Sequence, residues 1–181
     1  MVASARKALL LAAVCGQLLA QLAVTPAWAA EENPDVYLTV DSFLDSQFDQ
    51  APEQQMLWLD DAARAAARAV SGEDPGFRRR YWLDGERTAW VLDVIGRDHP
   101  ITVGVTVEHD RIVAMRVLVY RESRGWEVRH EFFTRQFEDA GLERQRLDRR
   151  IDGITGATLS VDAMRRAARL ALWLHARAKQ A

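Results

Sequence analysis

The residues whose types and spacing could do chemistry lie in one short segment, residues 152–160, with the sequence DGITGATLS. Gly153 and Gly156 give a loop of low bulk, and a predicted helix begins directly after it. The segment presents three side-chain hydroxyls, those of Thr155, Thr158 and Ser160. Because the first turn of a helix leaves backbone N–H groups free at the positive end of its dipole, the loop could hold a phosphate. The alternative is a simple helix cap, with Thr158 or Ser160 accepting one backbone N–H.

Residues 152–158, DGITGAT, resemble the signature Asp-x-x-Ser/Thr-Gly-Ala-Ser/Thr of the FMN-binding domain, and every required position is matched. That domain occurs in the C subunit of the sodium-translocating NADH:quinone reductase and in the G subunit of the Rnf complex. In those proteins an FAD:protein FMN transferase moves the FMN part of FAD onto the last hydroxyl residue of the signature. The resemblance implies that this residue is Thr158, whose hydroxyl would attack the FAD pyrophosphate, expel AMP and hold FMN as a phosphate diester.

The resemblance also implies a set of cofactor-binding residues around Thr158. The diester keeps a negative charge, which a helix N-terminus stabilises by about 0.3–1 kcal/mol. The remaining contacts would come from the same loop: Asp152, Gly153, Ile154, Thr155, Gly156, Ala157 and Ser160. Asp152 belongs to the recognition signature, and capping the loop through its own backbone is an additional or alternative role.

The likeness extends beyond the signature. Residues 104–112, 122–125 and 133–137 are similar to the strand, turn and Glu-x-x-Gly region of the same domain, so the resemblance covers roughly residues 81–176. Residues 30–80 do not match the subunits named, and no clear transmembrane helix is recognised. The chain is therefore more similar to a small stand-alone periplasmic member of the family.

An isoalloxazine ring needs a flat apolar face and polar groups at its edge, and the segment 121–137 has candidates for both. The aromatic candidates are Trp126, Phe132, Phe133 and Phe137, and the basic candidates are Arg121, Arg124 and Arg129. We predict further cofactor contacts from four residues of the segment: Glu122, Arg124, Trp126 and Phe133. The alternative is that the aromatic side chains form core and the arginines a solvated surface.

Composition limits the other kinds of function. Lys plus Arg total 24 and Asp plus Glu total 26, a net charge of −2, which gives no electrostatic reason to expect nucleic acid as a partner. The four histidines show no short metal-ligand spacing, and Cys15 is the only cysteine, so no metal site is predicted. No catalytic residues are predicted either, because no paired carboxylates and no nucleophile with an adjacent base are recognised.

Residues 1–29 have the features of a signal peptide. Arg6 and Lys7 precede an apolar run over residues 8–24, and Ala27 and Ala29 are the small residues that a signal peptidase reads. Cleavage after Ala29 would remove two basic residues and Cys15, leaving 22 basic and 26 acidic residues and no cysteine. Disulfides, thiolate metal sites and haem attachment through cysteine are then excluded, which leaves a flavin as the cofactor for redox work in the periplasm. Retention of the segment as an inner-membrane anchor is the alternative.

The elements that must position the loop are predicted as an α+β fold, an antiparallel sheet meander flanked by helices. Alternating apolar residues and the hairpin pair Asp84–Gly85 predict four strands, over residues 77–83, 88–95, 101–107 and 112–120. Helical spacing predicts helices over residues 42–48, 61–70, 131–137 and 160–179, the last one long. Asp60 and Gly72 are expected to cap and close the second helix. Gly104 inside a strand suggests a bulge or a close neighbour.

We divide the chain into a signal peptide at 1–29, an N-terminal extension with helices at 30–76 and an FMN-binding domain at 77–181. The expected function is an exported electron-transfer flavoprotein with FMN on Thr158, exchanging electrons with membrane or periplasmic redox partners rather than converting a substrate. Two alternatives remain at this point: a periplasmic flavin-dependent reductase, and a non-redox FMN-binding or sensory module.

Overall fold

The computed structural model describes residues 35–181. The expected signal peptide, its cleavage site and the alternative of a retained anchor lie outside the described residues. Within the described part, no helix combines the length and the apolar character that a membrane crossing requires.

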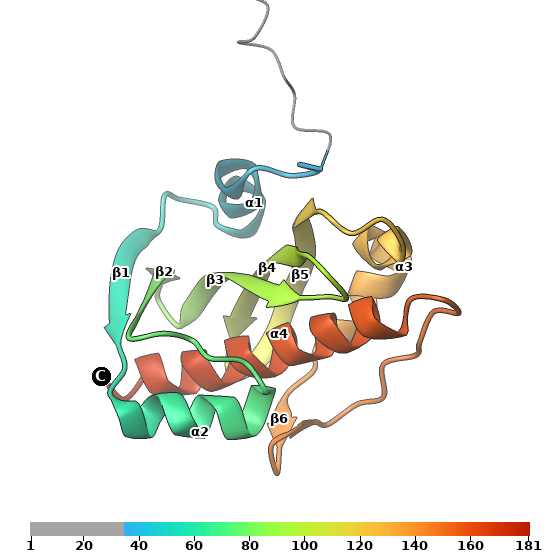
Figure 1. Cartoon of the computed structure of the whole chain (residues 1–181). Coiled ribbons are helices and arrows are strands. Elements are labelled where there is room, and N and C mark those ends of the chain that lie inside the picture. The colour runs from blue at the N-terminus through green and yellow to red at the C-terminus, as the bar shows by residue number, and fades with distance from the viewer. Residues whose placement is uncertain (1–34) are drawn as a thin grey trace, which may run out of the picture. The chain divides into compact units, whose positions relative to one another are not determined.

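Five strands form one antiparallel sheet in the order β1-β2-β3-β4-β5, so each strand pairs with its neighbour in sequence (Figure 1). Their bounds are β1 (Glu53–Trp58), β2 (Arg78–Asp84), β3 (Arg87–Ile95), β4 (Pro100–Glu108) and β5 (Arg111–Tyr120). The predicted meander is confirmed in β2 to β5. The structure adds β1, which the sequence pattern did not predict because only Leu57 of its six residues is buried.

The two edges of the sheet differ. Residues beside β5 cover part of that edge: the N–H of Tyr120 donates to the carbonyl of Asp35 at 2.9 Å, and Val36 bridges Val119. The opposite edge is β1, which pairs within the sheet only with β2. One edge of the meander is thus partly covered, whereas no strand within residues 35–181 pairs with the outer side of β1.

Helices lie on both faces of the sheet, as expected for an α+β fold (Figure 1). They are α1 (Val40–Gln47), α2 (Asp61–Ser71), α3 (Glu131–Thr134) and α4 (Thr158–Ala178), with 3₁₀ turns η2 (Trp126–Arg129) and η3 (Arg135–Phe137). A small hairpin joins β6 (Leu142–Glu143) to β7 (Arg146–Leu147). The ends of α2 are those predicted: Asp60 accepts a hydrogen bond of 2.7 Å from the N–H of Ala63, and Gly72 closes the helix at φ 81°.

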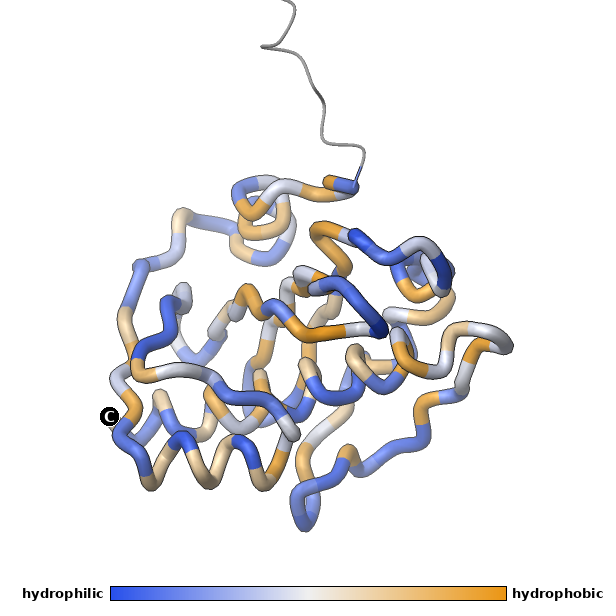
Figure 2. Tube along the Cα trace, viewed as in Figure 1, coloured by the Kyte–Doolittle hydropathy of each residue, from blue (hydrophilic) through white to orange (hydrophobic). Residues whose placement is uncertain are grey.

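Two hydrophobic cores hold the layers together. The larger core fills the space between the sheet and α4, whose apolar stripe, Val161, Ala163, Met164, Ala167, Ala168, Leu170, Ala171 and Leu174, is buried. In Figure 2 the side of α4 turned away from this core carries the hydrophilic residues. The smaller core lies on the opposite face, where Phe43 and Leu44 of α1 pack against Ala89 and Leu118. Helix α4 is therefore fixed along its length, which also fixes the position of its first turn.

Gly104 has the close neighbour that was one of its two predicted explanations. A Cβ at Gly104 would lie 2.7 Å from the ring of Phe43. The register shifts of the β4–β5 pair fall elsewhere, between Thr102 and Val103 and between Thr106 and Val107. Glycine is thus needed at this position so that α1 can pack against the sheet.

Candidate functional site

Three segments that are distant in sequence meet at the N-terminus of α4 and enclose a cavity of about 190 Å³. The first is the β3–β4 loop, the second follows β5, and the third is the loop that enters α4. The lining residues are Arg97, Glu122, Ser123, Arg124, Gly156, Ala157, Thr158, Leu159 and Ser160. Of the predicted cofactor-binding residues, the structure therefore brings together six: Glu122, Arg124, Gly156, Ala157, Thr158 and Ser160.

The first turn of α4 presents Thr158 to solvent. Thr158 is the first residue of the helix and is exposed. The N-cap residue is Ala157, and no side-chain hydrogen bond caps this end of the helix. Gly156 precedes it with φ 84°, a conformation that glycine adopts without strain. The first N–H groups of a helix have no intrahelical acceptor, and those of α4 belong to residues that line the cavity and receive no side-chain cap. The alternative of a simple cap by Thr158 or Ser160 is not what the structure shows.

Ser160 ties α4 to the segment that follows β5. Its Oγ shares a hydrogen bond of 2.9 Å with the hydroxyl of Tyr120, which donates to the carbonyl of Arg124 at 2.6 Å. Gly125 fits between them at φ 81°, where a Cβ would lie 2.6 Å from Ser160 Oγ. Burial raises the pKa of Tyr120, against the opposing hydrogen bond from Ser160, so the phenol stays protonated. Ser160 therefore positions the cavity wall.

Glu122 fixes the β3–β4 loop, the first of the three segments that enclose the cavity. Its Oε1 accepts hydrogen bonds from the backbone N–H groups of Arg97, of Asp98 at 2.7 Å and of His99 at 3.0 Å. A Cβ at Gly96 would lie 2.7 Å from the same oxygen, so glycine is required there. Desolvation raises the pKa of Glu122, but the three N–H donors outweigh it and hold this pKa below its ordinary value. The carboxylate is therefore engaged by the loop.

Two guanidinium groups stand at the cavity beside Thr158. Arg124 makes no side-chain hydrogen bond or ion pair with any residue of 35–181, and it is exposed. Arg97 is also exposed, and among residues 35–181 its guanidinium group pairs only with the neighbouring Asp98, at 3.4 Å. Sequence reasoning missed Arg97, since no motif marks it and its place depends on the hold of Glu122 on the loop. Two cations and an uncapped helix N-terminus make this cavity a favourable place for a phosphate.

The first four residues of the motif do not line the cavity. Asp152 forms an exposed ion pair of 3.1 Å with Arg150, and its N–H donates to Gln136 at 2.7 Å. The preceding carbonyl, that of Ile151, accepts from Arg165 of α4 at 2.5 Å. Asp152, Gly153, Ile154 and Thr155 thus shape the approach to α4, with Gly153 and Thr155 exposed at the surface.

The aromatic candidates separate into core and surface. Phe133 and Phe137 are fully buried and meet edge to face at 5.6 Å, so neither offers a face to a ligand. Trp126 is 45% exposed and directly follows Gly125 of the cavity wall, with Arg129 5.0 Å above its ring. The side chain of Arg121 is directed to β4, where it donates to Thr102 at 3.1 Å. Two aromatic candidates are accessible, Trp126 and Phe132, the latter 65% exposed, and Trp126 is the nearer of the two in sequence to the lining residue Arg124.

The described residues contain no cluster of three or more His, Cys, Asp or Glu that could hold a metal ion. The buried histidine, His175, instead belongs to the core: its Nδ1 lies 2.8 Å from the hydroxyl of Thr88, which also accepts from the Trp90 indole. Burial lowers the pKa of His175, with Asp110 opposing this shift, so it is neutral at pH 7. His175 does not line the cavity at α4.

Residues 96–173 match the family described as the FMN-binding domain. The match covers less than half of the chain, but it includes all three segments that line the cavity, from Arg97 to Ser160. Comparison with curated proteins and with solved structures gave no match. The family match supports a flavin-binding protein, with the cavity at α4 as the candidate site.

Proposed function

We propose that this protein is an exported electron-transfer flavoprotein that carries FMN through a phosphoester on Thr158. One observation carries the proposal: an accessible threonine hydroxyl stands on the uncapped first turn of α4, inside the region that matches the FMN-binding domain. A buried or capping hydroxyl could not serve as an acceptor for a transferase. The proposed acceptor is therefore the hydroxyl of Thr158, which is exposed and lies at a helix N-terminus beside Arg97 and Arg124.

Attachment requires an FAD:protein FMN transferase and FAD. Thr158 Oγ forms a bond to the phosphorus of the FMN half of FAD, the P–O bond to AMP breaks, and AMP leaves. The hydroxyl proton passes to a base of the transferase. The product is a monoanionic diester, which the first-turn N–H groups of α4 and the charges of Arg97 and Arg124 would stabilise.

The size of the cavity favours an exposed ring. About 190 Å³ holds a phosphate and part of its chain, whereas pockets that enclose a drug-sized ligand have about 300–1,000 Å³. Leu159, 51% exposed, and Trp126 provide apolar surface next to the cavity. An isoalloxazine at this surface supplies one-electron chemistry to whatever docks there, which suits an electron carrier better than an enzyme that encloses its substrate. The proposed partners are membrane or periplasmic redox proteins.

Intact-mass measurement tests the attachment. The protein is purified from the periplasm of a host with an active FMN transferase, and the expected gain is the mass of FMN less one water. Thr158→Ala is expected to lose the added mass, and Thr158→Ser to keep part of it. The matched control is Thr155→Ala, which removes an exposed hydroxyl of the same loop and is expected to keep the mass.

Two results would overturn the assignment. One is a Thr158→Ala protein that still carries the added mass, and the other is a wild type that never gains it beside an active transferase. Yellow colour released on denaturation would instead show FMN bound without a covalent bond. N-terminal sequencing of the native protein tests export, with a start at Ala30 expected.

A further inference from the structure

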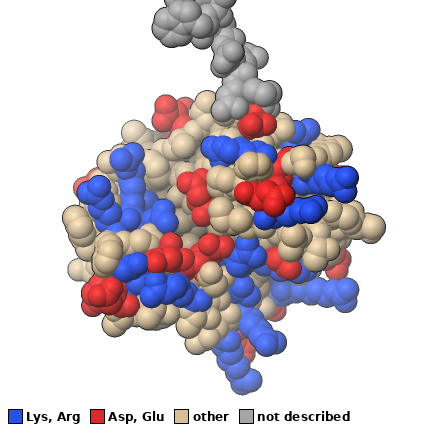
Figure 3. All heavy atoms as spheres, viewed as in Figure 1, with Lys and Arg blue, Asp and Glu red and all other residues tan. Residues whose placement is uncertain are grey.

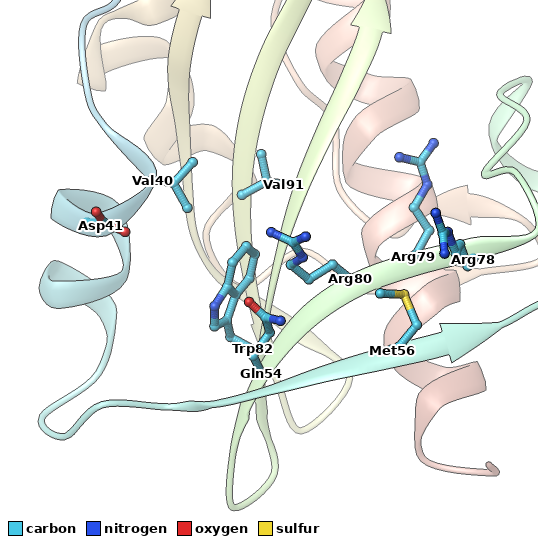
Figure 4. Close-up of a pocket in the computed structure, with 9 residues that line it drawn as sticks. All are labelled: Val40, Asp41, Gln54, Met56, Arg78, Arg79, Arg80, Trp82 and Val91. Atoms are coloured by element: carbon cyan, nitrogen blue, oxygen red, sulfur yellow. The ribbon is translucent and has the colours of Figure 1, made fainter.

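A second cavity, of about 670 Å³, lies on the face of the sheet that α1 covers only in part (Figure 4). We call it the arginine groove, and its defining residues are Met56, Arg78, Arg79, Arg80, Trp82 and Val91. None of them lines the cavity at α4. Asp41 of α1 is the acidic residue at its rim. In the view of Figure 3, basic side chains gather over β1 and β2.

The groove exists because β2 separates from β3. Residues 78–80 pair with Met56, Leu57 and Trp58 of β1, but the pairing of β2 with β3 begins only at Tyr81. The sheet is therefore open beside the three arginines, and Val91 of β3 faces the opening. The part of β2 that does not pair with β3 therefore consists of three consecutive arginines.

The three guanidinium groups have no partner in the described chain. No side-chain hydrogen bond or ion pair joins Arg78, Arg79 or Arg80 to any residue of 35–181, whereas Arg64 nearby is held by Asp74 at 2.7 Å. The Nε of Arg79 is buried and without an acceptor. Burial lowers the pKa of Arg79, although Asp93 and Asp74 oppose this shift. On the face of Trp82, the unpaired guanidinium groups of Arg78 and Arg80 would gain charge-assisted hydrogen bonds from an anion that enters the groove.

The floor of the groove is apolar and contains a large ring. Trp82 and Val91 are partly buried and pack against the Phe43 core, together with Val40 of α1. In Figure 4 the side chains of Trp82 and Arg80 project from β2 toward the space that Val40 and Val91 border. Because Trp82 and Arg80 are two residues apart on a strand, they lie on one face of the sheet. A flat ligand could stack on the indole while an arginine holds its charge.

We propose that the arginine groove binds a small planar aromatic anion, with its ring on Trp82 and its carboxylate or phosphate on Arg78 and Arg80, which share the Trp82 face of β2. The volume lies within the range of about 300–1,000 Å³ that is typical of small-molecule sites. A flat membrane surface fits less well, because the groove is a hollow that Val40 and Asp41 of α1 border on one side and β2 on the other. The site is independent of Thr158 and of what Thr158 carries.

Calorimetric titration with 2-naphthoate tests the proposal, with 2-naphthamide as a neutral probe of the same ring. We expect saturable binding of 2-naphthoate and at least about tenfold weaker binding of the amide, since charge-assisted hydrogen bonds are lost. Arg80→Gln is expected to weaken 2-naphthoate binding about tenfold. The matched control is Arg144→Gln, which removes one exposed charge in the β6–β7 turn and is expected to change nothing.

The ring contact is tested separately with Trp82→Phe and Trp82→Leu. We expect Trp82→Phe to keep most of the affinity and Trp82→Leu to lose it, with circular dichroism confirming the fold of each. Inorganic phosphate binding as tightly as 2-naphthoate would overturn the ring part of the proposal. Absence of saturable 2-naphthoate binding would overturn all of it, as would phosphatidylglycerol vesicles that bind in an Arg80-dependent manner while 2-naphthoate does not.

Discussion

At the N-terminus of α4 one oxygen of the acidic lining residue, Glu122, accepts from three backbone N–H groups, whereas Arg78, Arg79 and Arg80 of the arginine groove form no side-chain hydrogen bond or ion pair with any described residue. The first cavity is small, and each of its three walls is tied to another by a hydrogen bond or a glycine contact. The second cavity is more than three times as large and results from strands that separate. The proposed covalent attachment thus depends on an acceptor atom held in place, whereas the proposed reversible binding depends on unpaired charge.

The largest expected effect comes from Gly125→Ala, which would break the first cavity. Alanine at φ 81° is strained, and its Cβ would meet Ser160 Oγ at 2.6 Å, so we expect a loss of about 2–4 kcal/mol in the free energy of unfolding. Urea denaturation measures it. Gly153→Ala is the control, because a Cβ there meets no atom within 4 Å. Equal stability of the two variants would contradict the packing described at Gly125.

Gly104→Ala is expected to disturb the arginine groove and to leave the cavity at α4 unchanged. The new Cβ would lie 2.7 Å from the ring of Phe43, so α1 must shift at a cost of about 1–3 kcal/mol. We expect weaker 2-naphthoate binding with flavin attachment unchanged. The double variant Gly104→Ala, Phe43→Leu should cost less than the sum of the two single changes in urea denaturation. Strict additivity would show that the two residues do not compete for the same space.

Tyr120→Phe sharpens the comparison with a smaller change. It removes the bond to the carbonyl of Arg124 and leaves the buried Ser160 hydroxyl without its partner, which costs about 1–2 kcal/mol. Since Thr158 lies two residues before Ser160, we expect slower flavin attachment, measured as the rate of mass gain with purified transferase. Binding of 2-naphthoate should not change. A normal attachment rate would show that the acceptor does not depend on this network.

The smallest effect is expected at acid pH from Glu122. Its pKa is lowered in the folded state, so its contribution to stability is present above the unfolded pKa and is lost as the pH falls through the folded value. Glu122→Gln should therefore lower the urea midpoint at pH 7, and the difference from the wild type should disappear only when the pH falls through the lowered pKa of Glu122 in the folded state. Replacement of Glu143, an exposed carboxylate of β6, provides the comparison. A constant difference at all pH values would exclude the ionised carboxylate as the cause.

The sequence predicted those parts of the fold that depend on local pattern. The meander followed from alternating apolar residues, and α2 followed from Asp60 and Gly72, which cap it as expected. β1 was missed, because an edge strand with Glu53 and two glutamines lacks a buried face. The predicted start of α4 was two residues late, and the actual start makes Thr158 the first helical residue.

At the site, the sequence could name the motif but not its surroundings. Thr158 and Ser160 were predicted together, yet only the structure separates an exposed acceptor from a buried positioning residue. Arg97 was missed, because the contact between its loop and Glu122 joins residues about 25 positions apart. The sequence predicted both Phe133 and Trp126 as cofactor contacts, because spacing alone does not distinguish a buried aromatic side chain from an accessible one.

The open edge at β1 has a consequence for how the protein behaves at high concentration. Its outward backbone groups can accept a strand from another chain, whereas the β5 edge is partly occupied by the segment that includes Asp35 and Val36. β1 is only six residues long and begins with the charged Glu53, which limits such an addition. The polar side chains of this short strand therefore oppose edge-to-edge association, and a Gln54→Val, Gln55→Val double change in β1 is expected to favour it.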